Sequence, residues 1–139
     1  MNLSSEIEFK VDFNDCDPMR IVWHGNYIKY FEDGREAFGK EFPGCDYDIM
    51  MRTGITAPIY DIKVRCLAPL SMNDVAVIHT TYVYKPGARL DYKYEIYRER
   101  DGVLCCTGST TQLFIDPQGE QLLEEPDFYL EWKKKNGVI

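Results

Sequence analysis

The sequence lacks any long hydrophobic run. No stretch of its 139 residues approaches the roughly 20 apolar residues that a membrane-spanning helix needs. The first ten residues mix Glu and Lys with short apolar pieces and have no small-residue cleavage site, so we expect no signal peptide. We therefore expect a protein that does not enter a membrane and stays in the cytoplasm.

Residues that bind soft metals are few and poorly spaced. The chain has two histidines and five cysteines, without a Cys-x-x-Cys pair. This pattern indicates reduced thiols in a reducing compartment rather than a disulfide framework or a zinc site. A Gly-rich phosphate loop, a His-x-x-Glu-His metal motif and a Ser nucleophile elbow are also missing. The sequence therefore predicts an activity that uses no metal and no bound cofactor.

Positive charge is in the minority. The chain has 16 Lys and Arg residues against 23 Asp and Glu residues, for a net charge of −7. This balance argues against nucleic-acid binding, which needs a cationic surface. We interpret the run Lys133-Lys134-Lys135 as a solvated tail. An anionic ligand would need a local group of cations, because the overall charge does not attract it.

The chain has the length of a single domain, residues 1–139. Residues 6–13 alternate between apolar and polar, which predicts a half-buried strand. Residues 14–20 are rich in turn formers. Residues 24–40 change to a helical period, in which Tyr27, Phe31, Gly34 and Phe38 share one face. A glycine on that face weakens the helix, so we expect the helix to approach a sheet closely there.

The rest of the chain is typical of strands between two short helices. We expect strands at residues 60–66, 75–84, 90–96 and 103–115, with a tight hairpin at Asp101-Gly102, and helices at residues 47–52 and 127–134. Strands joined by hairpins form an antiparallel sheet with one face free for the long helix. The fold class predicted is therefore α+β, with about five antiparallel strands.

The chemistry is concentrated in residues 11–38, VDFNDCDPMRIVWHGNYIKYFEDGREAF. The segment contains Asp15-Cys16-Asp17, the apolar residues 21–23, then His24, and Asn26-Tyr27 where the helix should begin. It resembles the 4-hydroxybenzoyl-CoA thioesterase family of hot-dog-fold enzymes, and Glu32 matches an acidic position on that family's helix. The resemblance implies a curved antiparallel sheet wrapped around one long central helix.

The resemblance also implies site roles. Asp17 falls on the catalytic carboxylate, which acts as a nucleophile or as a general base on water. Backbone N–H groups near His24 and Gly25 would hold the oxyanion. The family's active site lies at a dimer interface, so the resemblance implies a homodimer or a homotetramer built from two such dimers, with acyl-CoA as substrate.

The physical chemistry agrees with this assignment. A thiol has a pKa of about 8.5, so a thioester has a good leaving group that needs little help from a general acid. The first turn of a helix offers unpaired N–H groups and a positive dipole end, which suit a developing oxyanion. Asp17 precedes that turn by only a few residues, so both features can meet at one site.

Other residues of the segment receive less specific roles. Asp15 is interpreted as a structural turn former, and Asn26 as a residue that orders the helix start or binds substrate. Trp23 and Tyr27 could pack in the core or line an acyl pocket. We interpret Glu32 and Arg35 as surface or interface charges. Cys16 is not expected to be a nucleophile, because its anionic neighbours disfavour the thiolate.

Arg20 stands where members of the family often have a small residue. Its cation could pair with Asp17, narrow the site or select an anionic acyl group.

The phosphates of CoA call for Lys or Arg residues. Lys85 and Arg89 flank a turn between two predicted strands, and basic residues in the corresponding region of the family contact the nucleotide. Lys63 and Arg65 are further candidates.

Three alternatives stay open at the level of sequence. One is hydrolysis of acyl-carrier-protein thioesters, which would need a basic docking patch. Another is dehydration of 3-hydroxyacyl thioesters, with His24 as the base and Asp17 as the carboxylate paired with it. The last is a binding module that holds acyl-CoA without turnover.

Overall fold

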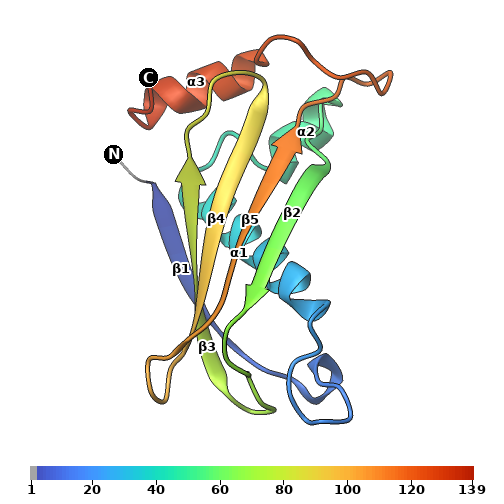
Figure 1. The fold of residues 1–139 in the computed structure, drawn as a ribbon. Helices are drawn as coiled ribbons and strands as arrows, with labels where there is room; N and C mark the ends of the chain where they lie inside the picture. The colour runs from blue at the N-terminus through green and yellow to red at the C-terminus, as the bar shows by residue number, and fades with distance from the viewer. Residues whose placement is uncertain (1–2) are drawn as a thin grey trace.

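A five-stranded antiparallel sheet forms the centre of the structure, a computed structural model that describes residues 3–139 (Figure 1). Across the sheet the strand order is β1-β3-β4-β5-β2. The strands are β1 (Ser4–Lys10), β2 (Ile59–Cys66), β3 (Val75–Val83), β4 (Arg89–Arg98) and β5 (Leu104–Leu113). Hairpins join β3, β4 and β5, whereas β2 pairs with β5 and not with the strand that follows it in the chain. The predicted α+β class with five antiparallel strands is confirmed.

Three helices accompany the sheet: α1 (Asn26–Glu41), α2 (Tyr47–Thr53) and α3 (Asp127–Lys135). In Figure 1, α1 crosses behind the sheet, α2 lies near the upper end of β2, and α3 lies beside the connection between β3 and β4. Asp46 caps α2 by accepting a hydrogen bond from the Ile49 N–H at 3.1 Å. Among residues 3–139, no helix is both long enough and apolar enough to cross a membrane.

The apolar face of α1 packs on the sheet as its period predicts. The Phe31 ring stacks on Tyr94 of β4 with a centroid separation of 4.3 Å and an interplanar angle of 5°. A Cβ atom at Gly34 would lie 2.4 Å from the Thr80 hydroxyl of β3, so only glycine fits there. The close approach of helix and sheet expected at Gly34 is therefore confirmed.

Strand β1 ends earlier than predicted. It stops at Lys10, and Phe13 begins a 3₁₀ turn, Phe13–Asp15, in which its side chain is 77% exposed. The cause is a reciprocal pair of hydrogen bonds: the Asp15 N–H donates to the Asp12 carbonyl at 3.0 Å, and the Asp12 N–H donates to the Asp15 carboxylate at 3.1 Å. These local bonds turn the chain before the alternation ends.

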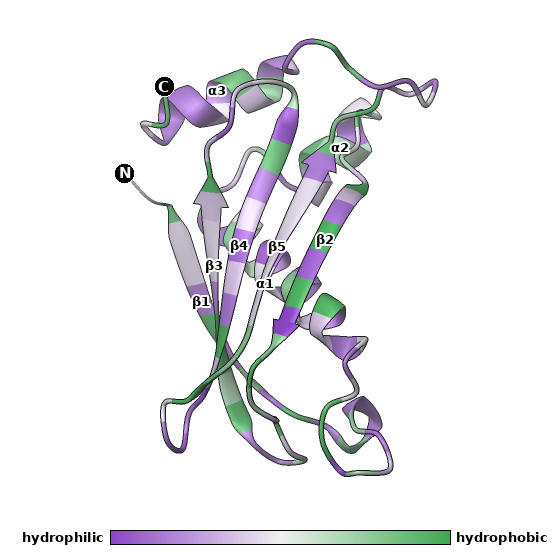
Figure 2. Ribbon diagram, viewed as in Figure 1, coloured by the Kyte–Doolittle hydropathy of each residue, from purple (hydrophilic) through white to green (hydrophobic). Residues whose placement is uncertain are grey.

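Strand β2 is exposed on both faces for nearly its whole length. Its alternation predicted one buried face, but β2 is an edge strand with β5 as its single neighbour in the sheet. Figure 2 shows hydrophobic bands between hydrophilic ones along β2. Exposed apolar side chains on and just after this strand are Tyr60, Ile62, Val64 and Leu67. An open, partly apolar sheet edge of this kind is suited to pairing with another strand.

The basic run at the end of the chain is only partly solvated. Lys134 and Lys135 are exposed, but Lys133 is buried. Its ammonium forms an ion pair with Glu125 and lies 4.6 Å from the centre of the Tyr129 ring. The interpretation of Lys133 as part of a solvated tail was therefore wrong, because Glu125, Tyr129 and Tyr84 surround its ammonium group.

Candidate active site

The loop before α1 is organised around the carboxylate of Asp15, which is 4% exposed. This carboxylate accepts hydrogen bonds from the Asp12 N–H at 3.1 Å, the Tyr30 hydroxyl at 2.9 Å and the Lys29 ammonium at 3.2 Å. Burial alone would raise the pKa of Asp15, but these donors outweigh it and hold the pKa below its ordinary value. The structural role predicted for Asp15 is confirmed.

The backbone of Asp15 ties this loop to the start of the helix. Its carbonyl accepts hydrogen bonds from the Trp23 N–H at 2.9 Å and from the Asn26 side-chain amide at 2.8 Å. Asn26 is the first residue of α1, so these two bonds fix where the helix begins relative to the loop. The Asn26 side chain thus joins the helix start to the loop, and its role in substrate binding stays a prediction.

A tight hairpin, residues 16–22, leads into α1 and is called the Asp17 hairpin below. Cys16 and Val22 form an antiparallel bridge, and the Asp17 N–H donates to the Ile21 carbonyl at 2.9 Å. One carboxylate oxygen of Asp17 accepts the Met19 N–H at 2.8 Å. Within residues 3–139 the other oxygen accepts no hydrogen bond, and no cation lies in ion-pair range. The half-buried Asp17 thus keeps one carboxylate oxygen free for chemistry.

Arg20 completes the hairpin with a left-handed backbone. Its φ is 66°, a conformation that side chains other than glycine adopt at a cost. Its N–H donates to the Asp17 carbonyl at 2.9 Å, which closes a turn followed by a left-handed residue, as in common three-residue hairpin loops. The Arg20 side chain is exposed and forms no ion pair with Asp17. A left-handed backbone favours glycine, so the expectation of a small residue at this position has a backbone reason.

Unpaired N–H groups precede the first turn of α1. The Asn26 N–H donates to the Trp23 carbonyl at 2.9 Å, and the Tyr27 N–H donates to the His24 carbonyl at 3.4 Å. The N–H groups of His24 and Gly25 have no acceptor in the described part of the chain. They stand at the positive end of the helix dipole, where an anionic oxygen is favoured.

The Trp23 ring occupies the space that a side chain at residue 25 would need. A Cβ atom at Gly25 would lie 2.2 Å from the Trp23 ring, so any other residue would displace that ring. Trp23 is 49% exposed, and its ring centre lies 5.1 Å from that of His24. Tyr27, in contrast, is buried in the core beside Tyr30. Of the two aromatic residues proposed for a pocket wall, only Trp23 is open to a ligand within one chain.

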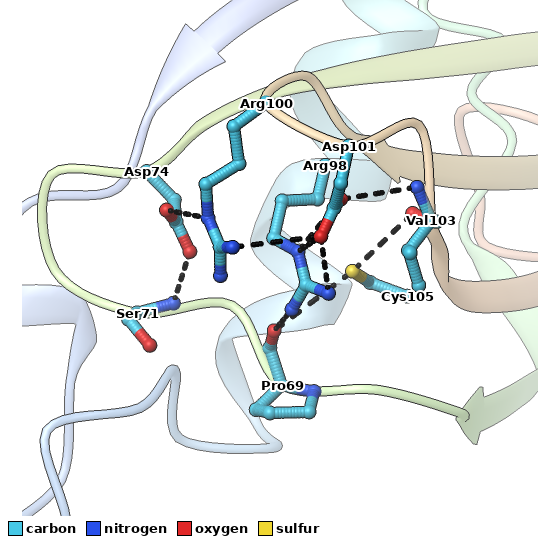
Figure 3. Close-up of polar contacts among 8 residues, drawn as sticks. All are labelled: Pro69, Ser71, Asp74, Arg98, Arg100, Asp101, Val103 and Cys105. Atoms are coloured by element: carbon cyan, nitrogen blue, oxygen red, sulfur yellow. Dashed lines mark hydrogen bonds and ion pairs between the residues drawn. The ribbon is translucent and has the colours of Figure 1, made fainter.

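The Asp17 hairpin rests on the connection between β2 and β3, which a group of arginines holds in place (Figure 3). The Val22 N–H donates to the Leu70 carbonyl at 2.8 Å. Arg98 donates to the neighbouring Pro69 carbonyl at 2.7 Å, while Arg100 bonds Asp74 at 3.0 Å. Sequence reasoning missed the role of these two arginines, because their bonds join residues 29 and 26 positions apart. The only local signal was the Asp101-Gly102 hairpin beside them.

The connection between β3 and β4, which contains Lys85 and leads to Arg89, lies near α3, at the opposite end of the sheet from the loop before α1 (Figure 1). Arg89 forms two hydrogen bonds, 2.7 and 2.8 Å long, with the buried Asp91, and Lys85 lies 3.7 Å from the same carboxylate. Within one chain these cations are thus neither beside Asp17 nor free of partners. Lys63 and Arg65 on β2 are exposed and have no ion-pair partner among residues 3–139.

Two features of the site bear on other chemistries. Burial and the neighbouring carboxylates Asp15 and Asp17 raise the pKa of the Cys16 thiol, so a Cys16 thiolate is disfavoured as predicted. Across residues 3–139, no three His, Cys, Asp or Glu side chains are grouped so as to hold a metal ion.

Comparison with known proteins gives a consistent result. Residues 11–133 match the thioesterase-like superfamily. A Bacillus subtilis protein provisionally named as an acyl-CoA thioesterase is 29% identical over 128 residues, which cover 92% of this chain and 91% of that protein. The 4-hydroxybenzoyl-CoA thioesterase of a Pseudomonas species is 25% identical over 94% of this chain and 98% of its own length.

Solved structures agree with the fold. A DHNA-CoA thioesterase from Staphylococcus aureus superposes with a TM-score of 0.85 at 26% identity, over 97% of this chain and 92% of that one. A variant of 4-hydroxybenzoyl-CoA thioesterase superposes with a TM-score of 0.79 at 21% identity, over 94% and 98% of the two chains. The hot-dog fold predicted from the sequence is confirmed by this likeness.

Proposed function

The chain belongs to the thioesterase-like superfamily, and on this basis we propose that it hydrolyses acyl-CoA to a free acid and CoA. Relatives whose names specify CoA thioesters support CoA as the carrier of the acyl group. Cytoplasmic location and independence of cofactors stay predictions from the sequence.

One observation carries the proposal: a free carboxylate oxygen of Asp17 and the unpaired N–H groups of His24 and Gly25 come from one short segment. The hairpin bonds of Asp17 and the bonds from Trp23 and Asn26 to the Asp15 carbonyl hold both ends of that segment. A base or nucleophile and an oxyanion site are what acyl transfer from a thioester requires.

In the proposed reaction, the thioester carbonyl oxygen accepts hydrogen bonds from the His24 and Gly25 N–H groups. A new C–O bond forms at the carbonyl carbon, either to the Asp17 carboxylate or to a water molecule that gives its proton to Asp17. The C–S bond then breaks and the CoA thiolate leaves with its electron pair. On the first route, water subsequently cleaves the acyl-Asp17 anhydride, so both routes yield the acid and CoA.

The proposed functional unit is a dimer that pairs through the open edge of β2. Antiparallel pairing of two β2 strands would cover the apolar residues of this edge and extend the sheet across both chains. Further pairing of dimers into a tetramer stays a prediction.

Strand β2 offers a matched test of the dimer. Val64 in β2 and Val103 in the β4–β5 hairpin are 38% and 37% exposed. A charge buried at an interface without a partner is costly, so Val64→Asp should lower the mass measured by sedimentation equilibrium to that of one chain. Val103→Asp should leave the mass unchanged. If wild type and both variants all have the mass of a dimer, the interface lies elsewhere. If all three have the mass of one chain, the proposed dimer does not form.

Lys85 and Arg89 stay the residues proposed to bind the phosphates of CoA, although they would have to share their charge with Asp91. Lys63 and Arg65 are the competing pair because they have no ion-pair partner in the described chain. The double variant of the pair that contacts CoA should raise KM for acyl-CoA and leave kcat almost unchanged. The other double variant should alter neither.

The activity is tested by thiol release over short, long and aromatic acyl-CoAs. Asp17→Asn should lower kcat by about 10²-fold or more, the lower range for loss of a general base. Asp33→Asn, which changes an exposed carboxylate on α1, should retain the wild-type rate. If Asp17→Asn and wild type release thiol equally fast, Asp17 is not the catalyst. Carrier-protein thioesters and enoyl formation from 3-hydroxyacyl-CoA should then be assayed.

A further inference from the structure

A cavity of about 450 Å³ lies between the C-terminal half of α1, the helix α2 and the adjoining ends of β4 and β5. None of its lining residues belongs to the Asp17 hairpin. Its size is within the range of small-molecule sites. Apolar walls come from Pro43, Cys45, Met50, Leu90 and Tyr92.

Most charged groups around this cavity already have partners. Glu36 pairs with Lys40 at 3.2 Å, and Asp48 pairs with Arg52 at 2.9 Å. The Asp46 carboxylate is occupied by backbone N–H groups at the start of α2. Arg35 is the exception, because no carboxylate of residues 3–139 lies within ion-pair distance of it.

The Arg35 guanidinium is held in one orientation. Its Nη1 donates to the Tyr94 hydroxyl at 3.0 Å, and that hydroxyl shares a second hydrogen bond with Thr110 at 2.5 Å. The Nε atom of Arg35 is buried and has no hydrogen-bond partner. The Tyr47 hydroxyl, which also lines the cavity, interacts with the guanidinium as well. The Nε–H is thus the donor left without an acceptor, and it can donate to an oxygen of a carboxylate.

A permanently charged guanidinium that is partly withdrawn from water and lacks a counter-ion is costly. From the sequence we interpreted Arg35 as a surface or interface charge, whereas in the structure it is half-buried and lines a cavity. We propose that this cavity binds a carboxylate carried on an apolar or aromatic body, with Arg35 as the anion-binding residue.

Such a carboxylate has two possible sources. It can be the distal carboxylate of an acyl group whose thioester lies in an active site, or a free acid such as the product of hydrolysis. Figure 1 places α2 and the Asp17 hairpin at opposite ends of β2. Antiparallel pairing of two β2 strands would bring the partner's cavity to the end where this chain's Asp17 lies, which favours the acyl group. This source rests on the proposed function and on the proposed dimer.

The first experiment measures binding and does not depend on hydrolysis. Benzoate, octanoate and adipate are titrated into the full-length protein by calorimetry, with benzyl alcohol as the uncharged analogue. At least one acid should bind, and Arg35→Met should weaken it by at least tenfold. Lys40→Met removes a cation that lines the same cavity but is already paired with Glu36, and it should retain the affinity.

The second experiment identifies the source. Adipoyl-CoA and hexanoyl-CoA have acyl chains of equal length and differ in the distal carboxylate. If the acyl group is the ligand, Arg35→Met lowers kcat/KM for adipoyl-CoA at least tenfold and leaves hexanoyl-CoA almost unchanged. If both substrates keep their ratio while free acids still bind wild type and not Arg35→Met, the free acid is the ligand.

Two results would overturn the proposal. One is the absence of acid binding to wild type together with an unchanged ratio of the two substrates. The other is dissociation of the Arg35→Met protein into single chains, which would assign the missing counter-ion to a partner subunit. Absence of any thioester hydrolysis would refute the proposed function and leave the binding experiment to decide on the cavity.

Discussion

Replacing Asp15 by Ala tests whether this buried carboxylate holds the catalytic loop together. The change leaves the Tyr30 hydroxyl and the Asp12 N–H without their acceptor. Hydrogen bonds to a charged group contribute about 1.5–3 kcal/mol each. The Lys29 side chain is mostly exposed, so its ion pair adds less than about 1 kcal/mol. Because these terms are not fully additive, we expect a loss of about 3–5 kcal/mol in the free energy of unfolding.

Urea denaturation at fixed protein concentration measures this loss, because an oligomer's apparent stability depends on concentration. Asp33→Ala is the matched control, since it removes an exposed carboxylate on α1, outside the loop. The double variant with Tyr30→Phe should show a coupling of at least about 1 kcal/mol. A loss of less than about 1 kcal/mol for Asp15→Ala would refute the structural role of this carboxylate.

The same carboxylate gives a pH dependence of known sign. Its pKa in the folded protein lies below the ordinary value of 3.8. Its contribution is therefore present in full above that value and is lost as the pH falls through the lower folded pKa. The difference in stability between wild type and Asp15→Ala should be constant near neutral pH and narrow below pH 3.8. A difference that widens on acidification would contradict this assignment.

Backbone geometry and side-chain contacts set the direction of four other perturbations. Arg20→Gly should raise the free energy of unfolding by about 0.5–1 kcal/mol, because glycine adopts the positive φ without strain; urea denaturation that shows a loss instead would argue against a strained backbone. Gly34→Ala should destabilise by about 1–3 kcal/mol despite its better helix propensity, since the added methyl meets Thr80, and a higher melting temperature would show that the sheet yields. Arg98→Met removes the bond to the Pro69 carbonyl and should lower kcat about tenfold by loosening the support of the Asp17 hairpin, an expectation that an unaltered kcat would exclude. Dialysis against EDTA should leave thiol release unchanged, whereas a loss restored by a divalent metal would show that hydrolysis uses one.

Local patterns predicted the elements and the motif well. The helical period identified the face of α1, and the glycine on that face pointed to the close contact with β3. Asp17 and His24 are separated by only a few residues, so the sequence predicted that the Asp17 loop lies close to the first turn of α1. These features depend on neighbours in sequence, which is the information that a single chain provides.

Features that depend on distant partners were not accessible in this way. The alternation of β2 indicates which side chains share a face, but not whether another element covers that face. The charge run at Lys133 gives no sign of Glu125 or Tyr84 as its neighbours. Arg35 looked like a surface charge because its contact with Tyr94 joins residues 59 positions apart. Long-range packing decides each of these cases.

The position of β2 also bears on how the protein is made. Its single neighbour within the chain is β5, and 37 residues, 67–103, separate the two strands. At a synthesis rate of about 5–20 residues per second, β2 waits roughly 2–7 s on the ribosome before synthesis of β5 begins. During that interval both of its edges are unpaired, and in the proposed dimer one edge stays unpaired until a second chain arrives. Nascent chains on neighbouring ribosomes of one messenger are the nearest source of such a chain, so assembly that begins during translation would shorten the period in which this edge can aggregate.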